Sequence, residues 1–199
     1  MADRPDVVLV RHGETEWSRT HLHTGRTDVP LTEVGRDQAE RAGRALAGRR
    51  FALVLSSPLG RALDTCRAAG LAERAEVTDD LAEWHYGDAE GLSTAQIQEG
   101  TPGWTVWTHP VGGTGESVAQ VGQRADRVIA RIERAVDEAG GDVVVFAHGH
   151  MLRILAARWL GMPADGGRHF ALGTATLSVL SWEHSNRVVE TWNDSAHLR

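Results

Sequence analysis

Three short stretches of the chain are apolar without alternation, at residues 6–10, 52–56 and 142–147. Each is rich in β-branched side chains, and an uninterrupted apolar run of this length is typical of a parallel strand that is covered on both faces. We therefore expect these runs to form the centre of one sheet. The segments 176–182 and 187–192 flank a short polar turn, and they predict two further strands, antiparallel at one edge.

Helical patterns lie between the predicted strands, at residues 32–48, 57–70, 117–140 and 151–160. Thr32 can cap the first of these helices, and Ser57 followed by Pro58 predicts the start of the second. In the third, the apolar residues recur every three or four positions up to the pair Gly140 and Gly141. Strand and helix thus alternate, which predicts an α/β fold, and 199 residues suit a single domain covering 1–199.

Two stretches do not fit this alternation, residues 21–30 and 101–116, which are rich in Gly, Pro and Thr. The second also contains Trp104 and Trp107. Aromatic residues in a loop are candidates for a lid over a site. They can equally pack over the core, and the sequence leaves both interpretations open.

Composition narrows the chemistry. The net charge of -6 argues against nucleic acid or an anionic membrane as the main partner. No apolar run is long enough to span a bilayer and the first residues do not resemble a signal peptide, so we expect a cytoplasmic protein. Cys66 is the one cysteine, which excludes an internal disulfide. All 21 basic residues are arginines, so mechanisms that need a lysine are excluded, whereas guanidinium groups suit the binding of phosphate or carboxylate.

The three predicted central strands all end in residues that carry chemistry. The first is followed by Arg11 and His12, the second by Ser57 and then Arg61, and the third by His148, Gly149 and His150. Because ligands bind at the carboxyl ends of parallel strands, these side chains should meet at one anion-binding edge.

Other histidines receive a structural interpretation, because a histidine considered alone is more often hydrogen-bonded than catalytic. They are His21, His23, His85, His150 and His184. The sequence HGH at 148–150 could suggest a metal site, but the neighbouring arginines would repel a cation. We therefore expect no metal ion.

Six motifs carry a family resemblance: RHGETEWS, HTGRTDVPLTEVGR, SSPLGRALDT, EWHYGDAEGL, GGTGES and FAHGH. Together they resemble the histidine phosphatase superfamily, which includes the cofactor-dependent phosphoglycerate mutases, and they span nearly the whole chain. The resemblance implies a phosphoglycerate mutase-like fold, a three-layer α/β/α sandwich with a mostly parallel central sheet. It also implies a covalent phosphohistidine mechanism without metal or cofactor and a small phosphorylated substrate. Many relatives are dimers, so it allows a homodimer.

The resemblance implies a role for each matching residue. His12 is the nucleophile, and Glu83 protonates the leaving alcohol and later activates water. A protonated His148 would stabilise charge on the transferred phosphoryl group. The expected phosphate-binding residues are Arg11, Arg61, His148, Ser18 and Gly149, and the expected substrate-binding residues are Thr24, Gly25, Trp84 and Tyr86.

Departures from the mutase pattern favour hydrolysis. Trp84 stands where mutases have an arginine, Ser18 where they usually have asparagine, and the mutase lysine has no counterpart. The chain is most similar to the bacterial broad-specificity acid phosphatases of the superfamily. The sequence therefore predicts a phosphatase acting on sugar or glycerate phosphates. Two alternatives are a cofactor-dependent phosphoglycerate mutase and a catalytically idle module that binds a phosphorylated ligand.

Overall fold

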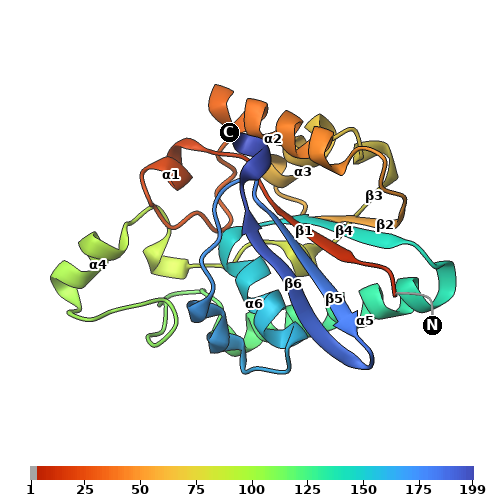
Figure 1. Ribbon diagram of the computed structural model, residues 1–199. Helices are drawn as coiled ribbons and strands as arrows, with labels where there is room; N and C mark the ends of the chain where they lie inside the picture. The colour runs from red at the N-terminus through yellow and green to blue at the C-terminus, as the bar shows by residue number, and fades with distance from the viewer. Residues whose placement is uncertain (1–3) are drawn as a thin grey trace.

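The predicted apolar runs become the central strands of a six-stranded sheet in a computed structural model that describes residues 4–199 (Figure 1). The strands are β1 (Val7–Arg11), β2 (Phe51–Ser56), β3 (Ala75–Val77), β4 (Asp142–Ala147), β5 (Leu177–Glu183) and β6 (Asn186–Asp194). Their order is β3-β2-β4-β1-β5-β6, and the first four are parallel. The predicted hairpin at the C-terminal end is confirmed, because β5 runs antiparallel to both β1 and β6.

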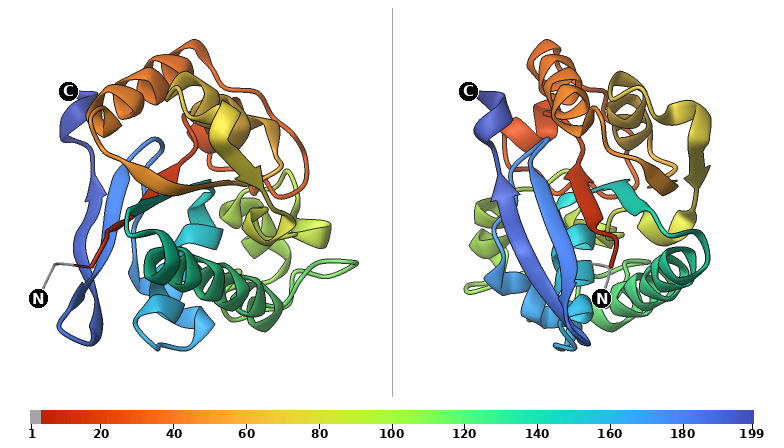
Figure 2. Two further views of the ribbon diagram at one scale, coloured as in Figure 1. Left: turned by 90° about the vertical axis from the view of Figure 1, so that its right-hand side faces the viewer. Right: turned by 45° about the vertical axis from the view of Figure 1, so that its right-hand side comes forward.

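Both faces of the sheet are buried, which explains why the central strands are apolar throughout. Successive side chains of a strand point to opposite faces. In β1, Val7 and Leu9 therefore pack into one apolar cluster, and Val8 and Val10 pack into the other. Helices α2 and α3 cover one face, and α5 and α6 cover the other (Figure 2). The expected three-layer α/β/α fold with a mostly parallel sheet is confirmed.

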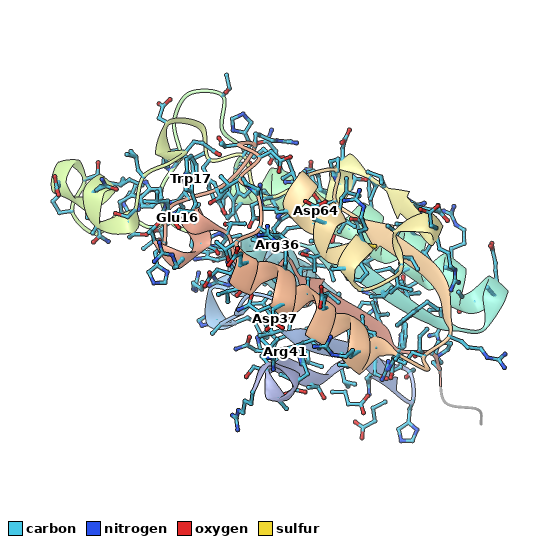
Figure 3. The ribbon with its side chains drawn as sticks, turned by 90° about the horizontal axis from the view of Figure 1, so that it is seen from above. Glu16, Trp17, Arg36, Asp37, Arg41 and Asp64 are labelled. Carbon is cyan, nitrogen blue, oxygen red and sulfur yellow. The ribbon has the colours of Figure 1, made fainter. Side chains whose placement is uncertain are left out.

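The helices are α1 (Glu16–Arg19), α2 (Glu33–Leu46), α3 (Gly60–Ala68), α4 (Thr94–Gly100), α5 (Val118–Ala139) and α6 (Gly149–Trp159). Thr32 caps α2 as predicted, through a hydrogen bond from the Gly35 amide. Seen from above, α2 carries Arg36, Asp37 and Arg41 on its outer side (Figure 3). Ala39, Ala42 and Leu46 of the same helix face the core. Within residues 4–199, no helix is both long and apolar enough to cross a membrane.

The predicted start of α3 at Ser57 is wrong. The helix begins at Gly60. Its first amide, Gly60 N, donates a hydrogen bond to Asp28 Oδ2 at 3.0 Å, and Asp28 belongs to a loop far away in the sequence. The Ser57 hydroxyl accepts from the Leu59 amide at 3.3 Å and also contacts a histidine at the end of β4. Helix α6 also begins earlier than expected, at Gly149. The patterns predicted neither β3 nor the short helices α1 and α4.

The two loop tryptophans belong to the core. Trp104 is buried, and its ring lies 5.3 Å from that of His23. Trp107 packs edge-on against Trp84 at 5.7 Å and against His150 at 5.0 Å. The loop that contains them is therefore held by apolar packing beside the carboxyl edge of the sheet.

Strand register brings the predicted site residues together. β4 lies between β1 and β2, with Arg11 opposite Ala147 and Ser56 opposite Phe146. His12 N donates to Ala147 O at 2.9 Å, and Ser57 N donates to Phe146 O at 3.0 Å. The three strand ends therefore place His12, Ser57 and His148 side by side.

Candidate active site

His12 lies at the end of β1 with only 4% of its surface exposed. Its Nδ1 donates to Gly13 O at 2.7 Å, so in the neutral ring the proton is on Nδ1 and the lone pair is on Nε2. Burial lowers the pKa of His12 well below its ordinary value of 6.5, and the positive charges of Arg11 and Arg61 lower it further. The site therefore presents a neutral imidazole whose Nε2 can act as a nucleophile.

His148 is fully buried beside His12, with 5.2 Å between the ring centroids. Its Nδ1 accepts from Arg61 Nε at 3.2 Å, so its Nε2 carries the proton and donates to Ser57 Oγ at 2.7 Å. Burial and the charge of Arg61 lower the pKa of His148 well below its usual value. The sequence predicted a protonated His148, whereas desolvation of the ring and the cation beside it favour the neutral form.

Arg61 is almost fully buried and is held by the loop that precedes α2. Besides its bond to His148, it donates to the carbonyl oxygens of Thr24, Gly25 and Thr27. Four of its five N–H groups are therefore used within the protein. Burial lowers its pKa below the ordinary value of an arginine, yet a guanidinium remains charged at any working pH.

Arg11 is arranged differently, because part of its guanidinium is unpartnered. It donates through one terminal nitrogen to Leu172 O, but its buried Nε has no hydrogen-bond partner among the described residues. The guanidinium also lies close to the first residue of α6, since a Cβ built on Gly149 would stand 3.4 Å from Arg11 Cζ. A buried N–H without a partner is costly, so this group is suited to an anionic ligand.

Glu83 is 5% exposed and lies at the N-terminus of α6. Its Oε1 accepts from the amides of Trp84 and Met151 at 2.9 Å, and its Oε2 accepts from the His150 amide at 3.0 Å. A carboxylate offers about four acceptor positions, so about one remains for proton exchange with a substrate or water. Among the described residues, Glu83 is the one carboxylate that lines the cavity beside His12.

This cavity has a volume of about 210 Å³ and opens at the carboxyl edge of the sheet. Seven of the predicted residues line it: Arg11, His12, Ser18, Thr24, Glu83, Tyr86 and Gly149. Arg61 and His148 are not among the lining residues. Three histidines given a structural interpretation, His21, His23 and His150, do line it, as does Arg153, which the sequence patterns did not indicate.

Three residues that the sequence predicted to bind phosphate or substrate make their hydrogen bonds within the protein. The Ser18 hydroxyl donates to Thr15 O at 3.0 Å as part of the cap of α1, so its proton is engaged. Gly25 does not line the cavity; its amide donates to Glu90 and its carbonyl accepts from Arg61. Trp84 is 1% exposed and does not line the cavity, because its indole donates to Glu116 O at 2.8 Å and its ring packs in the core.

A buried ion pair fixes the segment that carries Glu83. Arg124 of α5 binds Glu116 through two nitrogens at 2.8 Å, and it donates to the carbonyl oxygens of Asp80 and Ala82. Glu116 in turn accepts from the His85 amide at 3.0 Å. Sequence reasoning missed Arg124, because a single arginine on an amphipathic helix carries no local signal of burial.

Within residues 4–199, no group of three or more His, Cys, Asp or Glu side chains is arranged to hold a metal ion.

The aromatic residues around the cavity are packed against each other. Tyr86 OH lies 2.5 Å from His150 Nδ1, and the His23 ring lies 5.0 Å from that of Tyr86.

The chain is similar to several known proteins. The family model of the histidine phosphatase superfamily (branch 1) matches residues 7–195. An acid phosphatase of Mycobacterium tuberculosis is 44% identical over 193 residues, which are 96% of this chain and 93% of the relative. A sedoheptulose 1,7-bisphosphatase of Saccharomyces cerevisiae is 36% identical over 186 residues, covering 79% of this chain and 68% of the relative. The solved structure of an open reading frame product of M. tuberculosis superposes with a TM-score of 0.89 at 43% identity, covering 95% and 97% of the two chains.

Proposed function

The chain belongs to the histidine phosphatase superfamily (branch 1), and we propose that this acid phosphatase-type hydrolase works without metal through a phosphohistidine at His12. Its proposed substrates are small phosphorylated metabolites, such as sugar or glycerate phosphates, with broad specificity. The names of two relatives, an acid phosphatase and a sugar bisphosphatase, support phosphate esters as the substrate class.

The state of His12 carries the proposal. Its Nδ1–H is bound to Gly13 O, and burial beside two guanidinium groups keeps the ring neutral. The free lone pair on Nε2 is the nucleophile that the first step requires. The unpartnered Nε–H of Arg11 and the charge of Arg61 offset the charge that develops on the phosphoryl oxygens.

The proposed reaction has two displacements at phosphorus. His12 Nε2 forms a bond to phosphorus while the bond to the alcohol oxygen breaks, and Glu83 supplies the proton that converts the alkoxide to an alcohol. Water then attacks phosphorus, the P–N bond breaks, and Glu83 takes the proton of the water. Inorganic phosphate leaves, and both residues return to their starting states.

Two features favour hydrolysis over mutase chemistry. The residue after Glu83 is the buried Trp84, which brings no charge to the cavity. The chain also contains no lysine. The two charges that mutases carry at these positions are therefore absent here, which favours release of the product and attack by water.

Trapping of the covalent intermediate tests the proposal. Acid- and alkali-quenched reactions with a ³²P-labelled sugar phosphate should show label that is stable to alkali and labile to acid, and His12→Ala should abolish it. Phosphate release should be unchanged by EDTA. If His12→Ala keeps several per cent of wild-type turnover but carries no ³²P label, the covalent route is overturned. Rapid interconversion of 2- and 3-phosphoglycerate primed by 2,3-bisphosphoglycerate, with little free phosphate, would indicate a mutase, and binding without turnover would indicate an idle module.

A further inference from the structure

The segment just before β5, residues 171–175, contacts the strand end that carries the proposed nucleophile. Leu172 O accepts a hydrogen bond from the Arg11 guanidinium. The amide of Ala175 donates to Arg11 O at 3.0 Å and to His12 O at 3.1 Å. These bonds hold one terminal nitrogen of Arg11 and the peptide groups that follow Arg11 and His12. The placement of both residues therefore depends on where this segment lies.

Three side chains from the end of β6 and the turn after it hold the same segment. Each binds a backbone group of every second residue: Trp192 Nε1 donates to Ala171 O at 2.6 Å, Asn193 Oδ1 accepts from Gly173 N at 2.7 Å, and His197 Nε2 donates to Ala175 O at 3.0 Å. We call these three side chains the 192–197 clamp. Through residues 171–175, the clamp is connected to Arg11 and His12 by hydrogen bonds alone.

We propose that the 192–197 clamp positions Arg11 and His12 for phosphoryl transfer, with Asn193 and His197 as positioning residues. This inference rests on the proposed function, because it concerns the same reaction. None of the clamp side chains is among the residues that line the cavity, so none is placed to contact a substrate. Their effect on the reaction has to pass through residues 171–175.

The backbone of Ala175 explains why the segment needs this support. Ala175 is fully buried and has a φ of 53°, in the left-handed region that alanine rarely adopts. Such a conformation persists only where the surrounding contacts determine it. The bond from His197 to Ala175 O and the bonds from Ala175 N hold the peptide groups on both sides of this residue. Without the clamp, Ala175 can relax to a negative φ, which moves its amide away from Arg11 O and His12 O.

Asn193 and His197 are themselves fixed for this task. Asn193 has a φ of 58°, which asparagine tolerates better than most residues, and its amide donates to Ser178 Oγ at 3.0 Å. The Nδ1 atom of His197 is buried and has no hydrogen-bond partner within residues 4–199. The neutral ring therefore carries its one proton on Nε2 and donates it to Ala175 O.

Asn193→Gly tests the clamp, because glycine keeps the left-handed backbone but removes the acceptor for the Gly173 amide. In this variant, kcat for p-nitrophenyl phosphate should fall about tenfold or more and KM should rise about threefold. Attack by His12 is more sensitive to geometry than binding of the ester is. Asn193→Asp keeps an acceptor oxygen and should restore most of kcat. His184→Gly is the matched control and should leave kcat unchanged, because His184 is exposed in the turn between β5 and β6 and has a φ of 57°.

His197→Leu and His197→Gln form a second, independent pair. Leucine cannot donate to Ala175 O, so kcat should again fall about tenfold. The side-chain amide of glutamine can donate, so His197→Gln should recover part of the loss. Activity is expressed per folded molecule, measured by circular dichroism. This pair decides the question if Asn193→Gly does not fold.

Hydrogen exchange at the Ala175 amide, followed by NMR, measures the clamp without any turnover. Relative to exchange at Val8 in β1, exchange at Ala175 should be about tenfold faster in Asn193→Gly and in His197→Leu, because the segment opens locally. A purely global loss of stability would accelerate both amides alike. Inorganic phosphate, measured by calorimetry, should bind about threefold more weakly to both variants, because Arg11 is less well oriented.

These measurements separate the clamp from the reaction. If the wild type releases no phosphate, while both variants show faster exchange at Ala175 and weaker phosphate binding, the clamp stands and the proposed function fails. If the wild type is an active phosphatase, two results overturn the clamp and leave the function intact. One is wild-type kcat and phosphate affinity in both variants, and the other is exchange at Ala175 that changes no more than exchange at Val8.

Discussion

Acid should destabilise this protein through its two central histidines. His12 is 4% exposed and His148 is fully buried, and the pKa of each is lowered well below 6.5 by burial and by neighbouring arginines. As the pH falls below about 6.5, the unfolded chain takes up these protons but the native state does not. The contribution of the two groups is therefore complete above that pH and is lost as the pH falls toward their native pKa values.

The size of the effect follows from the number of protons. Each histidine that is neutral in the native state and charged in the unfolded state lowers the free energy of unfolding by about 1.4 kcal/mol per pH unit. Integrated from pH 6.5 to about pH 5.2, where carboxylates contribute little, the two groups together account for about 3 kcal/mol. Small domains are stable by about 5–15 kcal/mol, so the loss is measurable.

Urea unfolding followed by circular dichroism across this pH range tests the prediction. The double variant His12→Gln/His148→Gln should lose about 3 kcal/mol less stability than the wild type over the same interval, whatever its starting stability. Each single variant should show about half of that change, and His169→Gln, which removes an exposed histidine outside the site, should behave as the wild type. An equal loss in the wild type and the double variant would refute the reasoning, because it would mean that these rings take up protons in the native state.

Two further predictions concern Glu83 and its support. Glu83→Gln should slow phosphoryl transfer from a sugar phosphate by about 10²–10⁴-fold but leave a burst of nitrophenol from p-nitrophenyl phosphate, because nitrophenolate leaves without a proton; equal losses in quenched-flow experiments on both substrates would make Glu83 a binding residue. Arg124→Met should cost about 3–5 kcal/mol of stability in urea unfolding, because it leaves Glu116 unpaired and part-buried. If Arg124 positions Glu83, the variant should also reduce sugar phosphate turnover more than aryl phosphate turnover, and an equal reduction would indicate a structural role only.

The sequence alone determined the features that depend on neighbours within a few residues. Thr32 and Ser117 cap α2 and α5 with their own side chains, and Gly140 ends α5 with a positive φ of 61°. The continuous apolar runs indicated buried parallel strands. Because such strands end at one edge, the sequence also predicted that His12 and His148 would meet.

The tertiary structure decided what depends on residues far apart in the chain. Ser57 satisfies the local rule for a helix cap, yet its hydroxyl contacts His148, 91 residues away. The hydrogen bond from the first amide of α3 is accepted by Asp28. The neutral state of His148 depends on burial and on Arg61, and Arg153 enters the cavity only because α6 begins at the end of β4. Caps and periodicity act over one or two helical turns, whereas burial and charge are set by packing between elements that local sequence does not bring together.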